Sequence, residues 1–328
     1  MPHARRITSA SIADGDANLP SPVAPETHLT SSVLMIRPVQ FGFNEETAVN
    51  NAFQKRGGGP VQESALAEFD SFVKLLEASG INVTVIEDTA SPHTPDSIFP
   101  NNWFSTHSTG ELVLYPMRAP NRRQERKEAP LQAIKELGEK GRMKRILDLS
   151  GWEAKGRFLE GTGSMVLDRA NKTAFVCRSP RSDEDVLIRF CEELDYSYYY
   201  FNAYDRDMSL VYHTNVMMCM GDKFVVVCLD SIRDDNERKT FIEIVKKRDK
   251  EIVDISLEQM EKFAGNMLQL KCRNNESLLV MSSTARASLS GKQAAALEKY
   301  CKIIAPEISA IETNGGGSVR CMLAELFF

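Results

Sequence analysis

The feature of this 328-residue sequence that most constrains its fold is a repeated alternation of helical and strand-like patterns. Apolar residues recur at helical spacing in five stretches, near residues 62–79, 125–139, 183–194, 234–247 and 290–303. A run of strand-forming residues follows each stretch, at residues 81–86, 143–149, 196–201, 251–255 and 307–311. The alternation predicts an α/β fold made of five similar units.

Paired strand patterns give these units a common order. Two strand-like runs joined by turn residues precede each of the last four helices, at residues 96–105 with 112–115, 163–168 with 173–177, 216–220 with 223–228, and 266–270 with 278–281. The first helix has only residues 33–37 before it, and the C-terminal run 320–326 is its natural partner. If these two runs pair, five ββαβ units close into a ring, as in a propeller. An open α/β sheet is the alternative.

Composition narrows the class of protein. The net charge is -5, and no basic patch with interleaved aromatic residues is present, so we expect no nucleic-acid partner. No apolar run approaches the length that spans a bilayer, and no spacing typical of a metal or cofactor site occurs. Seven cysteines without framework spacing, and no secretory signal, predict a reducing, cytoplasmic setting. We expect a flexible tail over residues 1–30 and a single catalytic domain over residues 31–328.

A glycine-rich segment near the C-terminus holds one cysteine in an unusual setting. Glycines 315–317 are followed by Arg320 and Cys321. Glycine lets the backbone approach other groups closely, and a neighbouring cation favours the thiolate, which is the nucleophilic form of cysteine. The other six cysteines lie in apolar patterns typical of small buried residues. Cys321 is therefore a candidate nucleophile, with a structural role as the alternative.

Polar clusters stand just ahead of the first strand of several units. Their candidate residues are Asp96 and Asn102 in the second unit, Glu160 in the third, His213 and Asn215 in the fourth, and residues 264–266 in the fifth. In a ring, these strand ends converge with Cys321 at one mouth of the central channel. Cysteine, histidine and a carboxylate form a set of nucleophile, acid/base and orienting group. Taken singly, Asp96 could begin a turn, Glu160 could lie in a surface loop, and His213 could be a buried core residue.

At these clusters the sequence resembles the guanidino-group-modifying superfamily of arginine deiminases, amidinotransferases and dimethylarginine dimethylaminohydrolases. Residues 95–99 and 119–125 resemble the dimethylaminohydrolase signature, and residues 160–163 are similar to the family's Glu-Gly-Gly segment. His213-x-Asn215 is similar to its His-x-Asp motif, and residues 315–321 to its nucleophile loop. Residues 37–54 resemble the start of the citrulline utilization hydrolases. The resemblance covers residues 33–328 and implies the pentein fold, a five-bladed α/β propeller of ββαβ repeats closed by pairing of the N- and C-terminal strands.

The resemblance also implies roles for single residues. Cys321 would be the nucleophile, His213 the acid/base, and Glu160 the carboxylate that polarises the substrate and orients His213. The implied substrate-binding residues are Asp96, Asn102, Asn215, Arg123, Arg181 and Asn51. Among these, Arg123 and Arg181 would hold an α-carboxylate as bidentate forks, and Asp96 would contact the substrate's amino end or its guanidino group. No cofactor or metal ion is implied.

Two positions depart from the family pattern. Classical deiminases carry Asp at the positions of Asn102 and Asn215, where it clamps a guanidinium. A guanidinium has only donors, whereas a ureido group offers both a carbonyl acceptor and N–H donors, which an amide complements. The two amides therefore favour citrulline as the substrate. Arginine remains an alternative, because Asp96 and Glu160 could still meet its cationic guanidinium.

The expected function is cleavage of a C–N bond at the ureido or guanidino carbon of citrulline or an arginine-like amino acid. The products are ornithine or citrulline and ammonia, formed through a covalent cysteine intermediate. The alternatives are a dimethylarginine dimethylaminohydrolase, an amidinotransferase and a non-catalytic binding scaffold. The expected partner is a small arginine- or citrulline-like amino acid, with no membrane partner, and homo-oligomerisation is left open.

Overall fold

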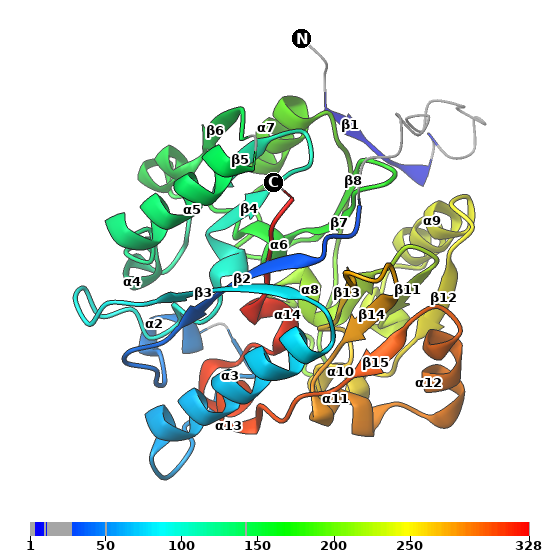
Figure 1. The fold of residues 1–328 in the computed structure, drawn as a ribbon. Coiled ribbons are helices and arrows are strands. Elements are labelled where there is room, and N and C mark those ends of the chain that lie inside the picture. The colour runs from blue at the N-terminus through cyan, green and yellow to red at the C-terminus, as the bar shows by residue number, and fades with distance from the viewer. Residues whose placement is uncertain (1–3, 10, 12–27, 50, 142, 328) are drawn as a thin grey trace.

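The computed structural model describes residues 4–9, 11, 28–49, 51–141 and 143–327. Its strands form five separate sheets, and no ladder joins one sheet to another within these residues (Figure 1). Four sheets have three strands: β16 (Ala324–Glu325), β2 (Ser32–Arg37) and β3 (Asn82–Glu87); β4 (Phe104–Thr106), β5 (Glu111–Leu114) and β6 (Arg145–Asp148); β10 (Met218–Met220), β11 (Phe224–Val227) and β12 (Glu251–Asp254); β13 (Leu268–Lys271), β14 (Ser277–Val280) and β15 (Lys302–Ile304). The fifth has β7 (Val166–Asp168), β8 (Thr173–Cys177) and β9 (Ser197–Phe201), with β1 (Arg5–Arg6) at its edge.

All five sheets repeat one topology. The middle strand pairs antiparallel with one neighbour and parallel with the other. A helical crossover makes each parallel connection, because parallel neighbours need a long connection between them. The crossover helices are α3 (Val61–Ala78), α5 (Glu128–Lys140), α7 (Glu184–Leu194), α9 (Asp235–Lys246) and α12 (Gly291–Glu298). These elements confirm the five predicted helical stretches and the mixed α/β class.

The crossover helices form where local signals and burial agree. The side chain of Asp183 accepts hydrogen bonds from the first turn of α7, and Asp234 does the same for α9. Each helix then buries its apolar stripe; α3, for example, buries Phe69, Phe72 and Leu76 completely. Within the described residues, no helix is long and apolar enough to cross a bilayer.

The C-terminal strand joins the sheet of the first unit. β16 pairs antiparallel with β2, through Ala324 with Leu34 and Glu325 with Val33. This confirms the predicted pairing of the two strands, although β16 is shorter than the predicted run 320–326. Residues 319–322 form the one-turn helix α14 (Val319–Met322) instead.

Two other predictions differ from the structure. The helix predicted over 290–303 ends at Glu298, and the last crossover returns through β15. The strand predicted over 307–311 is wrong, because these residues lead into helix α13 (Ser309–Gly315). The carboxylate of Glu68 on α3 accepts the amide N–H groups of Ala310 and Ile311 at 2.9 and 3.0 Å, which satisfies the start of that helix. Much of the predicted tail over residues 1–30 lies outside the described residues, but Arg5–Arg6 forms β1, parallel to β9.

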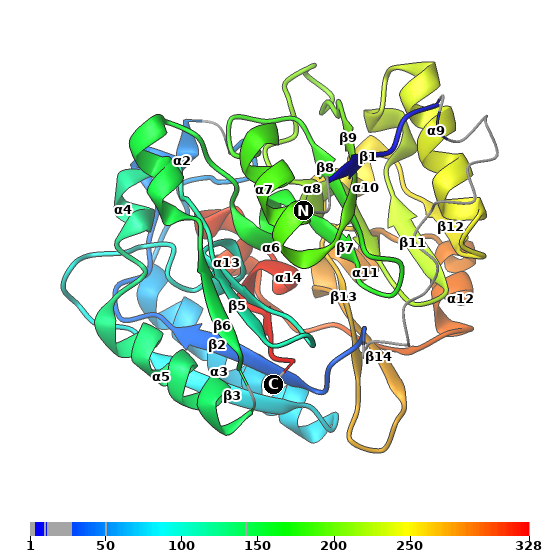
Figure 2. The same ribbon diagram turned by 90° about the horizontal axis from the view of Figure 1, so that it is seen from above.

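Short helical turns stand ahead of the first strand of four units and shorten it. They are η1 (Pro100–Asn102) before β4, α6 (Gly161–Ser164) before β7, α8 (Thr214–Met217) before β10, and α14 before β16. In Figure 2, α6, α8 and α14 lie toward the middle of the molecule. The remaining helices are α2 (Glu45–Ala48), α4 (Pro120–Arg123), η2 (Ser150–Lys155), η3 (Leu229–Ser231), α10 (Leu257–Glu261) and α11 (Ser283–Ser288).

Candidate active site

The central turns enclose a small polar cavity, here called the inner cavity. Its volume is about 20 Å³, which is room for one or two water molecules. The residues of chemical interest that line it are Cys321, His213, Asp96, Asn102, Arg122 and Arg181. Residues from four of the five units therefore meet in one place, although they are far apart in the sequence.

Two amide groups hold the sulfur of Cys321. Nδ2 of Asn266 lies 3.3 Å from Sγ, and Nδ2 of Asn215 lies 3.5 Å from it. Asn266 is itself fixed, because its Nδ2 also donates to the carbonyl of Asn215 at 2.8 Å and its Oδ1 accepts the backbone N–H of Arg320 at 3.0 Å. N–H donors directed at a sulfur stabilise negative charge on it. Asn266 belongs to the polar cluster seen ahead of the fifth unit but was not assigned a role from the sequence.

Glu160 and His213 form a buried pair beside Cys321. His213 Nε2 lies 2.8 Å from Glu160 Oε2, and Arg181 donates to the same oxygen at 3.3 Å. Burial opposes charge on both groups. At Glu160 it is outweighed by the Arg181 guanidinium and the hydrogen bond from His213, so the pKa of Glu160 lies well below its ordinary value. At His213 burial prevails over the Glu160 carboxylate and lowers the pKa to about 4.

These pKa shifts define the resting protonation state of the pair. Near neutral pH, Glu160 is an anion and His213 is a neutral imidazole. Nε2 carries the proton that is donated to Glu160, so Nδ1 carries the lone pair. The pair thus places a carboxylate against a neutral imidazole; the orienting role of Glu160 stays a prediction.

Close packing explains a glycine between two of these groups. A Cβ on Gly163 would lie 2.3 Å from Asn102 Nδ2 and 2.9 Å from His213 Nδ1. Real Cβ contacts are never so short, so only glycine lets the α6 turn fit between Asn102 and His213.

Three buried polar atoms at this site have no hydrogen-bond partner among the described residues: Asp96 Oδ1, Asn102 Nδ2 and Asn215 Oδ1. The other atoms of these side chains are engaged. Asp96 Oδ2 accepts from Asn44 Nδ2 at 2.8 Å and Thr47 Oγ1 at 3.0 Å, and Asn102 Oδ1 accepts from Arg122 at 2.7 Å. Burial raises the pKa of Asp96, although Arg122 and these hydrogen bonds oppose the rise. Unsatisfied buried polar atoms are costly, and functional sites are where such atoms are retained.

The two predicted arginines lie in different places. Arg181 faces the inner cavity, where it also donates to the carbonyl of Thr47 at 3.1 Å. Arg123 instead donates to the carbonyls of Met117 and Arg118, at 2.9 and 3.0 Å, and is not part of the cavity wall. Its neighbour Arg122, which the sequence analysis did not single out, takes the place at the cavity.

The covering segment, residues 44–49 and 51–54, contributes Thr47 and Asn51 to the wall of the inner cavity. Asn51 Nδ2 donates to the carbonyl of Gly316 at 3.1 Å, and Gln54 Nε2 donates to that of Asn314 at 2.9 Å. Gly316 also accepts from the Tyr212 hydroxyl at 2.6 Å. The predicted binding residue Asn51 thus contacts the loop that carries Cys321, and the covering segment is tied to that loop by several hydrogen bonds.

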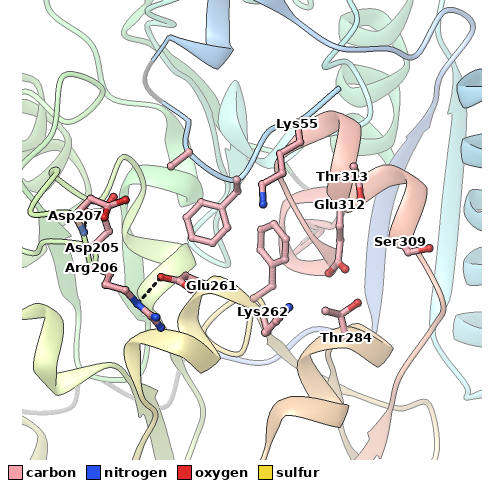
Figure 3. Close-up of a pocket in the computed structure, with 13 residues that line it drawn as sticks. Lys55, Asp205, Arg206, Asp207, Glu261, Lys262, Thr284, Ser309, Glu312 and Thr313 are labelled. Carbon is pink, nitrogen blue, oxygen red and sulfur yellow. Dashed lines mark hydrogen bonds and ion pairs between the residues drawn. The ribbon is translucent and has the colours of Figure 1, made fainter. Parts of the chain in front are cut away.

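A larger hollow, here called the outer pocket, adjoins this segment (Figure 3). Its volume is about 470 Å³. Phe53 lines the outer pocket, and the centroid of its ring lies 6.0 Å from that of Tyr212, which lines the inner cavity. The outer pocket carries charged side chains, including Lys55 and the ion pair of Arg206 with Glu261 at 3.1 Å. Neither a cysteine nor a histidine is among the residues that line it.

Within the described residues, no three His, Cys, Asp or Glu side chains are grouped so that they could hold a metal ion. The described residues bring a thiol and a neutral imidazole to one buried cavity, with the carboxylate of Glu160 hydrogen-bonded to that imidazole.

Comparisons with known proteins identify the fold and the family. Solved structures with the same fold include ArgZ, an arginine dihydrolase from the ornithine-ammonia cycle in Cyanobacteria, with a TM-score of 0.69 and 16% identity over 89% of this chain. The chain spans 40% of that protein, whereas it covers 96% of the separate N-terminal domain of ArgZ bound to substrate, with a TM-score of 0.68 and 15% identity. A dimethylarginine dimethylaminohydrolase adduct with S-methyl-L-thiocitrulline is similar over 91% of this chain and 100% of its own, with a TM-score of 0.62 and 14% identity. A search of curated proteins found no match.

The family described as "N,N dimethylarginine dimethylhydrolase, eukaryotic" matches residues 37–328. Since this match spans most of the sequence, the chain belongs to that family, within the guanidino-group-modifying superfamily.

Proposed function

We propose that this protein is a cysteine hydrolase that cleaves a C–N bond at the ureido or guanidino carbon of a citrulline- or arginine-like amino acid. The observation that carries the proposal is the inner cavity itself. There Cys321, held by two amides, shares a wall with neutral His213, which is paired with anionic Glu160. The family match and the dihydrolase and dimethylaminohydrolase structures support a hydrolase of this type.

The proposed reaction begins when His213 Nδ1 takes the proton of the Cys321 thiol. The thiolate attacks the substrate's central carbon, and His213 returns the proton to the departing amine. A bond from Sγ to that carbon forms as the C–N bond breaks. His213 then takes a proton from water, which attacks the same carbon and releases Cys321. Glu160 keeps the imidazole oriented and stabilises the imidazolium that forms at each proton transfer.

The unpaired atoms favour a neutral substrate group. Asn102 Nδ2 is a donor and suits a carbonyl oxygen, while Asp96 Oδ1 is an acceptor that suits an N–H group, and both residues line the inner cavity. A ureido group offers one carbonyl and several N–H groups, so it complements both atoms. We therefore propose citrulline as the substrate. Cleavage at the δ-nitrogen gives ornithine and carbamate, which decays to ammonia and CO₂.

The second candidate is dimethylarginine hydrolysis, which the family match favours. A methylated guanidinium is a cation, and Asp96 is the carboxylate in the inner cavity that could meet it. In this case the methylated nitrogen would leave as dimethylamine and the amino-acid product would be citrulline.

Our proposal extends to the setting of this chemistry. We propose that the five sheets are the blades of a closed propeller, supported by their shared topology and by the β16–β2 pairing. All seven cysteines are free thiols, which supports a cytoplasmic location.

Because Arg181 faces the cavity and Arg123 does not, we propose that Arg181 binds the substrate's α-carboxylate, with Asn51 beside it.

The test is product analysis with citrulline, arginine and dimethylarginine, using Cys321→Ser as the blank. Ornithine and ammonia from citrulline, absent with the blank, would support the proposal. Dimethylamine from dimethylarginine would favour the second candidate. Turnover of none of the three would contradict both.

A further inference from the structure

We infer that Arg122, held by Glu125, is a positioning residue that decides whether the inner cavity prefers a neutral ureido group or a cationic guanidinium. It acts by fixing the orientation of the Asn102 amide. The inference rests on the proposed function, since it concerns the selectivity of that same site.

Arg122 is held rigidly. Its Nε lies 2.7 Å from Glu125 Oε1 and one terminal nitrogen lies 3.0 Å from Oε2, which is a bidentate pair. That nitrogen also donates to the carbonyl of Phe99 at 3.1 Å. The side chains of Arg122 and Glu125 are 3% and 1% exposed, so solvent does not weaken the pair.

The other terminal nitrogen of Arg122 sets the amide. It lies 2.7 Å from Asn102 Oδ1. Arginine can only donate hydrogen bonds, so the amide oxygen must face Arg122 and the NH₂ group must face away from it. That NH₂ is the unpaired buried donor, and Asn102 lines the inner cavity. Rotating the amide would place two donors against each other in a buried site.

The consequence is a polarity filter. An NH₂ group held in place accepts a carbonyl oxygen and disfavours the N–H groups of a guanidinium. An aspartate at this position would keep one oxygen on Arg122 and present the other to the substrate, which reverses the polarity. Arg122 therefore has no need to touch the substrate in order to influence its choice.

The decisive variant removes both members of the Arg122–Glu125 pair; it also takes a cation away from Asp96, whose Oδ2 lies 3.9 Å from Arg122 Nε. Arg122→Met with Glu125→Met deletes both partners at similar volume, because removing only one would leave the other uncompensated. Arg206→Met with Glu261→Met, an exposed ion pair in the outer pocket, is the matched control. Thermal melting and alkylation of Cys321 by iodoacetamide establish that each variant is folded with a reactive site.

The measurement is the ratio of citrulline to arginine affinity, by calorimetry, in a Cys321→Ser background, together with kcat and KM in the active enzyme. We expect the ratio to fall at least tenfold in the Arg122/Glu125 variant, mainly through weaker citrulline binding, and to stay unchanged in the control. Asn102→Asp should invert the preference, and Arg122→Lys, which keeps a donor, should retain part of it. A folded Arg122/Glu125 variant with an unchanged ratio would overturn the inference.

Binding separates this inference from the proposed function. If the parent enzyme hydrolyses neither substrate but the affinity ratio still falls as expected, the proposed reaction fails and the filter stands. Hydrolysis with an unchanged ratio means that the filter fails and the reaction stands. Binding of neither amino acid would overturn the inference as well, because Asn102 would then face no such ligand.

Discussion

The inner cavity and the outer pocket differ both in volume and in the kind of residues that line them. The outer pocket, at about 470 Å³, is over twenty times larger than the inner cavity, at about 20 Å³. Its charged groups are mostly exposed, and its ion pair is screened by water. The inner cavity is lined by Cys321, His213 and the unpaired polar atoms of Asp96 and Asn102, all removed from solvent. Our proposal therefore places the chemistry in the inner cavity because of its buried polar groups without partners, and not because of pocket size.

Loss of the proposed nucleophile should lower activity more than any other change. If it did not, the contrast between the inner cavity and the outer pocket would fail. Cys321→Ser replaces the thiol by a much weaker nucleophile, so we expect turnover to fall on the order of 10⁴-fold or more. Steady-state ammonia release measures this. The control is Cys272→Ser, a cysteine outside the inner cavity, which should keep its activity; equal loss in both variants would point to a folding defect.

Removing the charge of Glu160, the partner of His213, should have the second-largest effect on activity. Glu160→Gln keeps the size of the side chain but removes the charge that holds His213 and Arg181. We expect kcat to fall by about 10²- to 10⁴-fold, the usual contribution of a positioned acid/base, with a smaller change in KM. Activity within threefold of the parent would show that the His213–Glu160 pair is structural only.

Crowding the inner cavity should lower both stability and activity. The Cβ of Gly163→Ala would overlap Asn102 and His213, so we expect a loss of about 1–3 kcal/mol in the free energy of unfolding, with reduced kcat. Gly151→Ala is the control, because a Cβ there meets nothing within 4 Å. Denaturant unfolding of both variants measures the difference, and similar stability of the two would contradict the packing described.

The buried histidine should make stability depend on pH. Its pKa is lowered to about 4 in the folded protein, against an ordinary value of 6.5. Between these values the unfolded chain binds the extra proton, so stability should rise with pH from about 4 to 6.5, by up to about 3 kcal/mol from this residue. Comparing the melting temperatures of the parent and His213→Gln across this range isolates the effect. If the melting temperatures of the two proteins changed with pH in the same way, His213 would not be the source of the pH dependence.

The outer pocket should show the smallest effect. Arg206→Ala with Glu261→Ala removes an exposed ion pair, for which we expect at most about 1 kcal/mol of stability and less than a twofold change in kcat/KM. A tenfold loss of activity would mean that the outer pocket takes part in the reaction, and the contrast with the inner cavity would fail.

The sequence predicted the parts of the molecule that local patterns determine. Helical periodicity located the crossover helices, and polar residues at strand starts located Cys321, His213 and Glu160 near one another. The strand over 307–311 was mispredicted because Glu68, far away in the sequence, satisfies the start of α13 instead. A local pattern cannot show such a long-range cap.

Adjacent residues posed a similar problem at the site. Arg122 and Arg123 have the same chemistry, and only the path of α4 against η1 decides which one faces the cavity. The role of Asn266 likewise depends on contacts with Asn215 and Cys321 that packing creates. Its position ahead of β13 was the one signal available from sequence.

Trapping the covalent intermediate tests the central claim most directly. The enzyme would be quenched with acid during turnover of citrulline and digested, and the peptide that contains Cys321 would be weighed by mass spectrometry. We predict a carbamoyl group on Cys321 in the enzyme quenched during turnover, and none on that peptide in enzyme that has not met citrulline. A modified residue elsewhere, or ornithine production with Cys321 unmodified under every quench condition, would contradict the account.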